Sequence, residues 1–371
     1  MAEDNSISLI FDTGSFHSRA GYATDDFPRV VYPSIYGYPR SEIDPNPNPA
    51  LNYYGKNALQ HSASLTLNEI FPDAKEPMNW DLYEAFIHTV ISDELQIEQL
   101  ERPVLTNFYQ NSGKEIREKD CQLFFENFGA SSYFSVSTGL LGLYSSGRLN
   151  GVVLDAGHRQ TSVTPVIDGS PLLYASVYSS FGGRDITQFL QTKLNLSREL
   201  ARHVKETYCI SATDYDRESG EYRTVKSSDD DEVTLPDGTK IPDGRQACAI
   251  ASEAPYRPSV IGSIAPGIQE MIFASLTKTD FDLRRELAGN IIFTGGASCF
   301  GNFTDRMQKE LSLLVPSLLK AKVLNFPDKT MALAAWNGGA IISSVGTFQT
   351  MWITRSEYED YGPSITLRKC M

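Results

Sequence analysis

The residues with the clearest chemical potential are Asp12-Thr13-Gly14-Ser15, which directly follow the apolar run from Ile7 to Phe11. A second short apolar stretch follows near Ala20 to Ala23, so the pattern predicts two strands joined by a turn that carries the aspartate and the glycine. The same pattern returns between Gly151 and Ile167, with Asp155-Ala156-Gly157 after its first strand. Two strands that each end in Asp-x-Gly indicate an internal duplication.

An Asp-Thr-Gly turn is typical of two kinds of site. In an aspartic protease, two such loops bring two carboxylates together to share one proton. In a phosphate-binding hairpin, small residues let backbone N–H groups approach a phosphate, while the aspartate holds a hydrated Mg²⁺ ion. A tight turn without a ligand is the third interpretation. The protease is disfavoured because Ala156 stands where the second loop needs a hydroxyl residue, and because the chain has too many helical segments for that nearly all-β class.

Two further glycine turns favour the phosphate interpretation. Phe181-Gly182-Gly183-Arg184-Asp185 opens a predicted helix, and Gly295-Gly296 follows the apolar run from Ile291 to Thr294. Helix N-termini and glycine turns after strands suit an anion or a nucleotide. Each turn alone also fits close packing of backbones, but four such turns in one chain favour a nucleotide.

The elements that would position these turns alternate between strands and helices, which predicts an α/β class. Apolar residues recur at helical spacing in six segments, and Ser197 is a candidate N-cap. The predicted helices cover Trp80 to Leu95, Lys114 to Phe128, Asp185 to Leu194, Ser197 to Cys209, Ile268 to Leu276, and Phe303 to Val315.

Composition narrows the possible classes of protein. The chain has 371 residues, 41% of them hydrophobic, which is enough for two or three domains or for one duplicated architecture. Its net charge of −13 argues against direct binding to nucleic acid. Five cysteines without a C-x-x-C pair argue against a disulfide scaffold and a cysteine-rich zinc module. The uncharged stretch from Thr330 to Thr354 is too polar for a membrane span, and the N-terminus lacks the basic segment of a signal peptide, so we expect cytosol or nucleus.

Two irregular stretches are expected to be solvated surface. Ser41 to Asn52 contains repeated Pro-Asn dipeptides and predicts a protruding loop, since proline cannot donate to a strand ladder. Ser227 to Glu232 is acidic, and Leu235-Pro236-Asp237-Gly238 after it predicts a turn.

Several longer motifs resemble the actin and actin-related protein family along nearly the whole chain. They comprise Ala20 to Asp26, Pro33-Ser34-Ile35, Leu143 to Arg148, Phe303 to Glu310, Trp336 to Gly339, Met351 to Thr354, Gly362 to Ile365 and Arg368-Lys369-Cys370. The resemblance implies an actin-like ATPase fold, in which duplicated ribonuclease-H-like domains with four subdomains surround a nucleotide cleft. It implies a first half over residues 1–148 (with a small subdomain near 33–72), a second half over 149–335, and a C-terminal segment, 336–371, that returns to the first half.

The resemblance also implies roles for individual residues. The implied ligand is ATP or ADP with Mg²⁺, and Asp12 and Asp155 would orient the metal through water. The implied nucleotide-binding residues are Asp12, Thr13, Gly14, Ser15, Arg19, Asp155, Gly157, Arg159, Gly183, Arg184, Lys205, Glu206, Gly295 and Gly296. Without the resemblance, Lys205-Glu206 would be interpreted as a solvated helix face.

The sequence departs from the family where hydrolysis would occur. Phe16 stands where the family usually has glycine, and Asp155-Ala156-Gly157-His158-Arg159 replaces the usual Asp-Ser-Gly-Asp-Gly. Thr138 aligns with the water-positioning glutamine, and Ser162 with a histidine near the attacking water. Hydrolysis needs an oriented water, so we predict weak or absent ATPase activity and assign no catalytic residue. His158 and Arg159 could pair with phosphates or form internal salt links.

Two classes of function follow from the resemblance. The first is a structural subunit of a cytoskeletal or a nuclear chromatin complex, located in the cytoplasm with the nucleus as the alternative. The second is an ATP-binding, polymerising divergent actin with slow ATPase activity. The expected partners are proteins: actin, actin-related proteins, or a helix bound in a groove near Tyr144, Thr347 and Met351. Trp352 is a further candidate there, although core packing explains it equally well.

Overall fold

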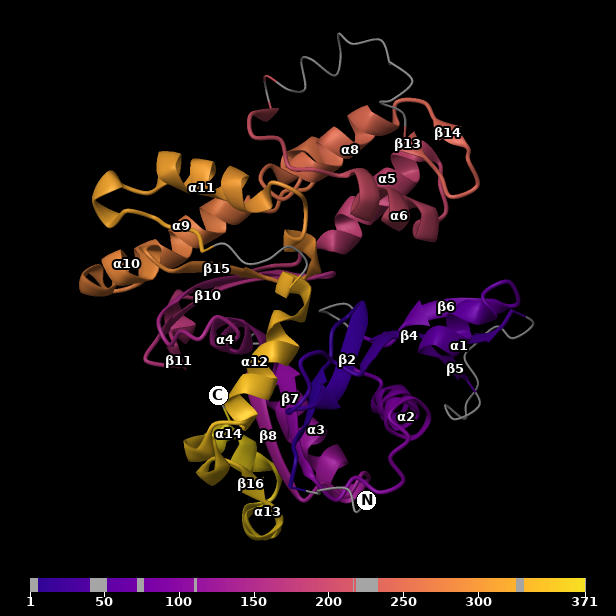
Figure 1. Ribbon diagram of the computed structural model, residues 1–371, viewed down its shortest axis with the longest axis vertical. Coiled ribbons are helices and arrows are strands. Elements are labelled where there is room, and N and C mark those ends of the chain that lie inside the picture. The colour runs from indigo at the N-terminus through magenta and orange to yellow at the C-terminus, as the bar shows by residue number, and fades with distance from the viewer. Residues whose placement is uncertain are drawn as a thin grey trace. The chain divides into compact units, whose positions relative to one another are not determined.

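The computed structural model describes residues 6–40, 52–71, 77–109, 112–215, 217, 233–324 and 330–370. The chain divides into two compact units. The first consists of Met1–Gly147 and Ala334–Met371, and the second of Arg148–Leu333. The chain therefore leaves the first unit once and returns to it for its C-terminal segment. Each unit is built on a sheet of its own (Figure 1).

A six-stranded sheet forms the centre of the first unit. Its strands lie in the order β16 (Ile353–Thr354), β8 (Ser132–Ser137), β7 (Pro103–Phe108), β1 (Leu9–Asp12), β2 (His17–Tyr22) and β3 (Val30–Pro33). β1 and β2 form the antiparallel hairpin that the sequence predicts. β7 runs parallel to both β1 and β8, so these three strands end at the same edge of the sheet.

Helices cover both faces of this sheet. They are α2 (Trp80–Thr89) and α3 (Lys114–Glu126) on one face, and α4 (Thr138–Tyr144) and α12 (Ala334–Ser343) on the other. Alternation along β1 separates the two faces. Leu9 and Phe11 join the core under α2 and α3, whereas Ile10 faces α12 so closely that a Cβ on Gly339 would meet its side chain at 2.7 Å.

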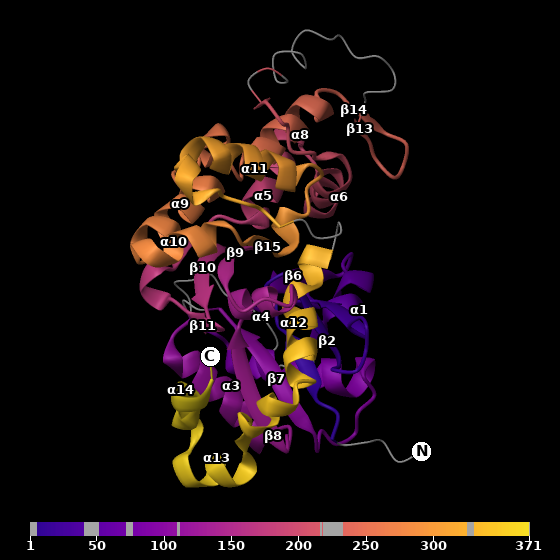
Figure 2. The ribbon, with the colours of Figure 1, turned by 60° about the vertical axis from the view of Figure 1, so that its left-hand side comes forward.

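Smaller elements complete the first unit. A three-stranded sheet follows β3 and carries a short helix, and the C-terminal helices lie beside β8 and α3 (Figure 2). These elements are β4 (Ile35–Pro39), β5 (Tyr53–Tyr54), α1 (Gly55–Gln60), β6 (Leu65–Glu69), α13 (Arg355–Tyr361) and α14 (Thr366–Lys369).

The second unit repeats the hairpin arrangement. Its sheet contains β11 (Ser170–Pro171), β10 (Thr161–Ile167), β9 (Gly151–Ala156) and β15 (Ile291–Thr294), with β12 (Val177–Ser179) paired to β10. β9 and β10 are antiparallel, as predicted, and β15 runs parallel to β9. The main core of the unit lies between this sheet and three helices: α9 (Ile268–Lys278), α10 (Phe281–Ala288) and α11 (Phe303–Leu314).

A second cluster in this unit contains three more helices and a short hairpin. These are α5 (Gly183–Leu194), α6 (Arg198–Tyr208), α8 (Gly244–Glu253), β13 (Val233–Thr234) and β14 (Lys240–Ile241). Ser197 caps α6, as predicted, because its side chain accepts the Leu200 N–H. Leu235 to Gly238 form the predicted turn, and Gly238 adopts a positive φ of 84°.

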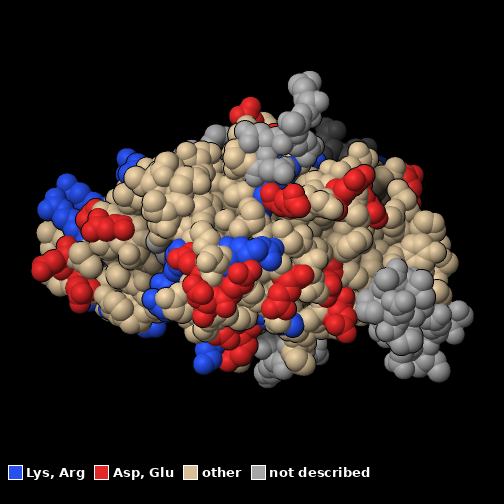
Figure 3. All heavy atoms as spheres, turned by 90° about the horizontal axis from the view of Figure 1, so that it is seen from below, with Lys and Arg blue, Asp and Glu red and all other residues tan. Residues whose placement is uncertain are grey.

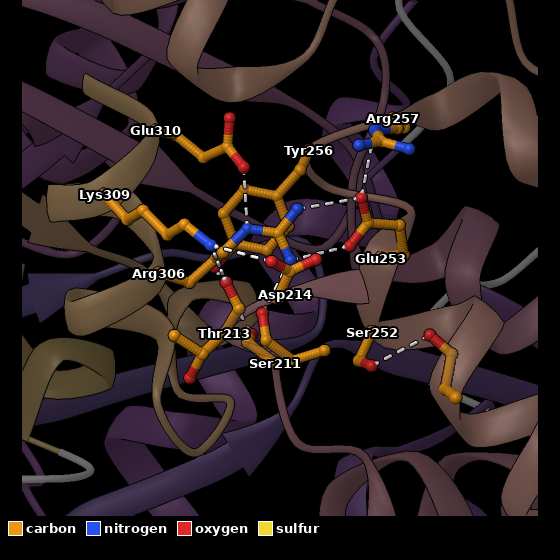
Figure 4. A network of polar contacts seen from close by, with 12 residues as sticks. Ser211, Thr213, Asp214, Ser252, Glu253, Tyr256, Arg257, Arg306, Lys309 and Glu310 are labelled. Atoms are coloured by element: carbon orange, nitrogen blue, oxygen red, sulfur yellow. Dashed lines mark hydrogen bonds and ion pairs between the residues drawn. The ribbon is translucent and has the colours of Figure 1, made fainter. Parts of the chain in front are cut away.

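A buried ion pair joins α8 to α11. The Arg306 guanidinium donates to both carboxylate oxygens of Glu253 at 2.9 Å, and both side chains are almost completely buried (Figure 4). Arg306 also donates to Glu310 and lies over the Tyr256 ring. Lys309, one turn along, makes a solvent-exposed pair with Asp214.

The six predicted helices are present, with shifts at their ends. The first predicted helix is divided into two parts: the α-helix α2 ends at Thr89, and a π-helical turn over Val90–Glu94 follows it directly. Sequence periodicity missed α1, α4, α8, α10, α13 and α14, which are all ten residues or shorter. The uncharged stretch after Thr330 contains α12, and no helix of the described residues is long and apolar enough to cross a membrane. Residues 41–51 and 227–232, for which surface loops were expected, lie outside the described residues.

Candidate functional site

The first candidate loop is built around the buried carboxyl of Asp12. This residue ends β1 directly opposite Arg19 on β2, and Arg19 Nη1 lies 2.9 Å from Asp12 Oδ2. Burial raises the pKa of Asp12, and the positive charge and hydrogen bond of Arg19 oppose that rise. The cross-strand pairing therefore places the two residues together, as the hairpin interpretation requires.

Asn107, which the sequence analysis did not single out, holds this loop from the neighbouring strand. It lies near the end of β7, and its Nδ2 donates to Asp12 Oδ1 at 3.0 Å. Its Oδ1 accepts the Thr13 backbone N–H at 2.6 Å and the Thr13 hydroxyl at 2.9 Å. An amide residue near the end of a strand that begins with an apolar run is the signal that could have identified it.

Gly14 and Ser15 form the tight part of the turn. A Cβ on Gly14 would lie 2.5 Å from the His17 carbonyl oxygen, so a larger residue would push the hairpin open. Ser15 is buried, and the half-buried Phe16 ring packs edge-on against His17 with centroids 4.4 Å apart. The turn is thus closed on one side by a bulky aromatic pair.

Thr138, which the family resemblance predicts to stand at the position of the water-positioning glutamine, begins α4. Its hydroxyl donates to the Phe108 carbonyl at 3.1 Å and lies 3.3 Å from Asn107 Nδ2. The side chain is buried, and its hydroxyl proton is used inside the protein. Thr138 is therefore integrated into the same network as Asp12 and Asn107.

The second candidate loop follows the same plan in the second unit. Asp155 lies on β9 and is buried, and it accepts a hydrogen bond from Thr294 on the parallel strand β15 at 3.2 Å. In each unit, the hairpin aspartate thus accepts a hydrogen bond from the strand parallel to its own. Asn107 and Thr294 occupy these equivalent positions.

Gly295 is required by its backbone and by its surroundings. Its φ is +88°, and a Cβ there would overlap the Ala156 carbonyl oxygen and approach Asp155 Oδ1 to 2.8 Å. Gly296, the next residue, begins a 3-10 turn, and a Cβ there would meet nothing within 4 Å. Of the two residues, only Gly295 must lack a side chain, because its backbone lies directly against Ala156 and Asp155.

The turn after Asp155 is fastened to the N-terminus of α5. Gly157 N–H donates to Gln160 O at 2.9 Å, Gly183 N–H to Gly157 O at 3.0 Å, and Arg184 N–H to His158 O at 2.7 Å. The first N–H groups of α5 therefore bind the hairpin itself. Gly157 and Gly183, two of the predicted nucleotide-binding residues, therefore lie together, and their N–H groups are engaged within the protein.

Cationic side chains lie in and near this turn, which is hydrogen-bonded to the start of α5. Arg159 and Arg184 are half-buried, and His158 Nε2 lies 3.5 Å from Arg198 Nη2 on α6. Lys205 reaches from α6 to α5, where its Nζ donates to the Gly183 carbonyl and the Thr187 hydroxyl. Burial lowers the pKa of Lys205 to about 8.

Glu206, which was predicted to bind nucleotide together with Lys205, lies in a different environment. Its side chain is exposed and lies 3.9 Å from Arg202, one turn earlier on α6. The interpretation as a solvated helix face therefore describes Glu206, whereas Lys205 is tied to α5.

The predicted partner groove falls on the first unit. Tyr144 ends α4, which packs on α12, and Thr347 and Met351 follow α12 in and just after a 3-10 turn. Tyr144 and Met351 are half-buried, and Thr347 is exposed. Two apolar residues that the sequence analysis did not include, Ile341 and Val345, are each 45% exposed on and after α12.

Trp352, in contrast, belongs to the core. It is buried, and its ring lies 5.3 Å from that of Phe348 and 6.4 Å from that of Phe134.

The predicted nucleotide-binding residues thus form two sets. Asp12, Thr13, Gly14, Ser15 and Arg19 lie together in the first unit, and the others lie in the second. Within the described residues, no group of three or more His, Cys, Asp or Glu side chains forms a metal cage. Metal binding at either loop would therefore depend on a single carboxylate and on water.

Comparison with known proteins gives matches over nearly the whole chain. The family model described as Actin matches residues 3–199 and 195–371. The chain is 30% identical over 377 residues to a Dictyostelium discoideum protein that carries the name actin-29, and the alignment covers 98% of this chain and 97% of that protein.

Proposed function

Because this chain belongs to the actin family and has its fold, we propose that it is a structural subunit that binds ATP or ADP with Mg²⁺ and hydrolyses ATP weakly or not at all. Hydrolysis requires a group that orients the attacking water. Thr138, at the position of the family's glutamine, has a short side chain whose hydroxyl donates to Phe108 O. This is the observation that carries the proposal.

Retention of nucleotide binding is supported by the two buried aspartates. Asp12 and Asp155 each lie on the first strand of a hairpin, and each is fixed by a hydrogen bond from a parallel strand. Single carboxylates suit Mg²⁺, which keeps most of its water ligands. When bound at either loop, the ion would neutralise phosphate charge, and the carboxylate of that loop, Asp12 or Asp155, would hold its waters.

The phosphate contacts would differ from a purely backbone cradle. The N–H groups of Thr13, Gly183 and Arg184 donate to other protein groups. The Arg159 and His158 side chains lie beside the fastened turn of the second unit and could supply charge-assisted contacts instead. We therefore expect phosphate affinity to depend on side-chain cations more than on backbone donors.

Protein partners are supported by the exposed surface. Ile341 and Val345 leave apolar surface uncovered beside Tyr144 and Met351, which suits an amphipathic partner helix. Acidic side chains are spread over the face seen in Figure 3, with Lys and Arg among them, and the net charge of −13 favours basic partner surfaces. We propose actin, actin-related proteins or a helical segment of another subunit as partners, in the cytoplasm or, alternatively, in the nucleus.

Polymerisation as a divergent actin is the second candidate function. It is favoured by exposed apolar residues on three neighbouring elements of the second unit: Phe281 at the start of α10, Leu313 on α11 and Leu318 in the following 3-10 turn, each at least 77% exposed. Sedimentation with Mg·ATP and salt separates the two functions. Reversible pelleting of the pure protein would support a polymerising actin, and a soluble monomer would support a subunit of a larger complex.

The test of the first proposal compares T138Q with T138S. Calorimetry should give a measurable affinity for Mg·ATP in the wild type and in both variants. Release of phosphate should rise at least about tenfold in T138Q, because an amide can orient water, and should stay unchanged in T138S. Fast hydrolysis by the wild type, or no gain in T138Q, would contradict the role assigned to Thr138.

A further inference from the structure

A pocket of about 400 Å³ lies in the first unit, beside the end of α2. This volume falls within the range of small-ligand sites, roughly 300–1,000 Å³. Four apolar side chains contribute to its lining: Ile91, Ile97 and Leu100 are buried, and Phe128 is half-buried. The pocket therefore offers an apolar interior that the hydrophobic core of the unit does not fill.

The π-helical turn over Val90–Glu94 shapes this pocket. Leu95 N–H donates to Val90 O, five residues back, and Ile97 N–H donates to Ile91 O, both at 3.0 Å. A π turn contains one residue more than an α-helical turn, and such turns are frequent at functional sites. The extra residue changes the direction of the side chains that follow it, and Ile91 and Ile97 both line the pocket.

Gln96 lines the pocket from a backbone position that favours glycine. Its φ is +56°, in the left-handed region that ends many helices and in which a side chain is disfavoured. Its side chain is exposed, so packing in the core does not explain it. Residues held against their backbone preference gather at binding sites, and we therefore interpret the amide of Gln96 as a ligand contact.

Two further polar residues of the lining are bonded to carboxylates. Asn127 Nδ2, at the end of α3, donates to Glu84 Oε1 on α2 at 2.7 Å. The Ser92 hydroxyl, in the π-helical turn, donates to Asp93 Oδ1 at 2.8 Å. The first of these bonds joins α2 to α3, so the two sides of the pocket are already tied together before a ligand binds. A preformed site lowers the entropic cost of binding.

The charge at the pocket is mainly negative. Glu98 is exposed and lines the pocket directly, in addition to the two carboxylates that are bonded to lining residues. Within the described residues, no Lys or Arg side chain lines this pocket, and His88 is its only basic lining residue. An apolar interior with an acidic rim suits a long side chain that has an apolar stem and a cationic head.

We propose that this pocket binds an arginine side chain of a protein partner, whose guanidinium meets Glu98 and Gln96 and whose stem lies against the apolar lining. Arginine fits better than lysine, because its planar guanidinium matches a carboxylate and also packs on an aromatic ring such as that of Phe128. The net charge of −13 favours a basic partner as well. The inference rests on the proposed role as a subunit with protein partners, and it is independent of nucleotide binding.

The test uses the capped peptide acetyl-Leu-Arg-Leu-amide and full-length protein labelled at the δ1 methyl groups of isoleucine. The methyl resonances of Ile91 and Ile97 report on the pocket, because both side chains line it. We expect them to shift saturably, with a Kd on the order of 1 mM or tighter, which one anchored side chain allows. The same peptide with citrulline, a neutral isostere of arginine, should bind about fivefold more weakly.

Glu98 and Glu101 provide a matched pair of variants. Both are exposed, but only Glu98 lines the pocket. E98Q should weaken binding of the arginine peptide about fivefold, the upper range for an exposed ion pair. E101Q makes the same change outside the pocket and should leave the affinity within about twofold of the wild type, because salt screens the more distant charge.

Q96G tests the third contact without threatening the fold. Glycine accepts the left-handed backbone, so the melting temperature should stay level or rise, while the affinity for the peptide falls about threefold as the amide is lost. A variant that is as stable as the wild type and binds less tightly cannot be explained by unfolding. Unchanged affinity in Q96G would overturn the contact assigned to this residue.

Three results would overturn the proposal: equal binding of the arginine and citrulline peptides, equal losses in E98Q and E101Q, or no shift of either methyl resonance. Spermidine provides the comparison with a free polycation. If it shifts the two resonances at lower concentration than the peptide does, the occupant is a small amine, and the assignment to a partner protein is wrong. A protein that binds the peptide but no Mg·ATP would refute only the nucleotide part of the proposed function, and the reverse result would refute only the pocket.

Discussion

Asn107 fixes Asp12: its Nδ2 lies 3.0 Å from Oδ1 of the buried carboxyl. The two residues are 95 positions apart in the sequence and meet because β7 lies parallel to β1. The amide oxygen of the same side chain is occupied by Thr13, so the amide cannot turn without losing hydrogen bonds at both ends. Asn107 thereby sets the geometry of the first loop.

Replacing Asn107 by Asp should destabilise the protein in a pH-dependent way. N107D removes the donor to Asp12 and places a second buried carboxyl beside it, which we expect to cost about 2–4 kcal/mol at pH 7. The cost should be smaller at pH 5, because two adjacent carboxyls can share one proton. Urea unfolding at both pH values checks this expectation.

Asn127 supplies the control for that experiment. Its Nδ2 donates to Glu84 at 2.7 Å, but it is exposed at the end of α3. N127D makes the same chemical change beside a carboxylate in solvent and should cost less than about 1 kcal/mol. Equal losses in the two variants would show that Asp12 is not in a dry, fixed environment.

The two glycines after β15 should differ sharply in their tolerance of alanine. G295A combines a positive φ with overlap of Ala156, and should lower the free energy of unfolding by about 2 kcal/mol or more. G296A meets open space and should cost less than about 1 kcal/mol. Chemical denaturation of both variants measures the difference, and similar values would contradict the backbone assigned to Gly295.

The buried ion pair between α8 and α11 should be costly to break. R306M leaves the buried Glu253 with only the partly exposed Arg257, 3.3 Å away, as a cationic partner, and we expect a loss of about 2–4 kcal/mol. K309M removes an exposed pair from the same helix and should cost less than about 1 kcal/mol. The double variant E253Q/R306M should recover part of the loss of R306M. Additive losses would indicate that the two side chains do not depend on each other.

Lys205 should make stability depend on pH in the alkaline range. Its pKa falls from about 10.5 in the unfolded chain to about 8 in the fold, so between these values the unfolded chain binds more protons. The stability that the neutral Lys205 amine allows is therefore fully present above pH 10.5 and is lost as pH falls through 8. We expect the stability of K205M relative to the wild type to be higher at pH 8 than at pH 10, by about 1–3 kcal/mol, as measured by urea unfolding. A gain that is the same at both pH values would argue that the ammonium is not desolvated.

Local sequence patterns predicted the hairpins, the long helices and the place of Asp12 and Asp155 at the end of a hairpin strand. These features depend on hydrophobic periodicity and turn residues, which are local in the sequence. Asn107 and Thr294 were missed, since their roles depend on which strands lie side by side. Lys205 and Glu206 are adjacent in sequence, yet one reaches α5 and the other remains in solvent. The N–H groups of Gly183 and Arg184 were expected to face a ligand, and the packing of one hairpin on α5 occupies them instead. Each of these outcomes depends on tertiary neighbours that no spacing encodes.

We propose above all that this actin-family chain binds ATP and hydrolyses it weakly or not at all. The most direct measurement loads the pure protein with ATP labelled at the γ-phosphate, removes free nucleotide, and follows the bound label over time. We predict that the label stays with the protein as ATP, since Thr138 offers no amide to orient a water. Release of phosphate at a rate comparable to that of filament-assembled actin would contradict the account.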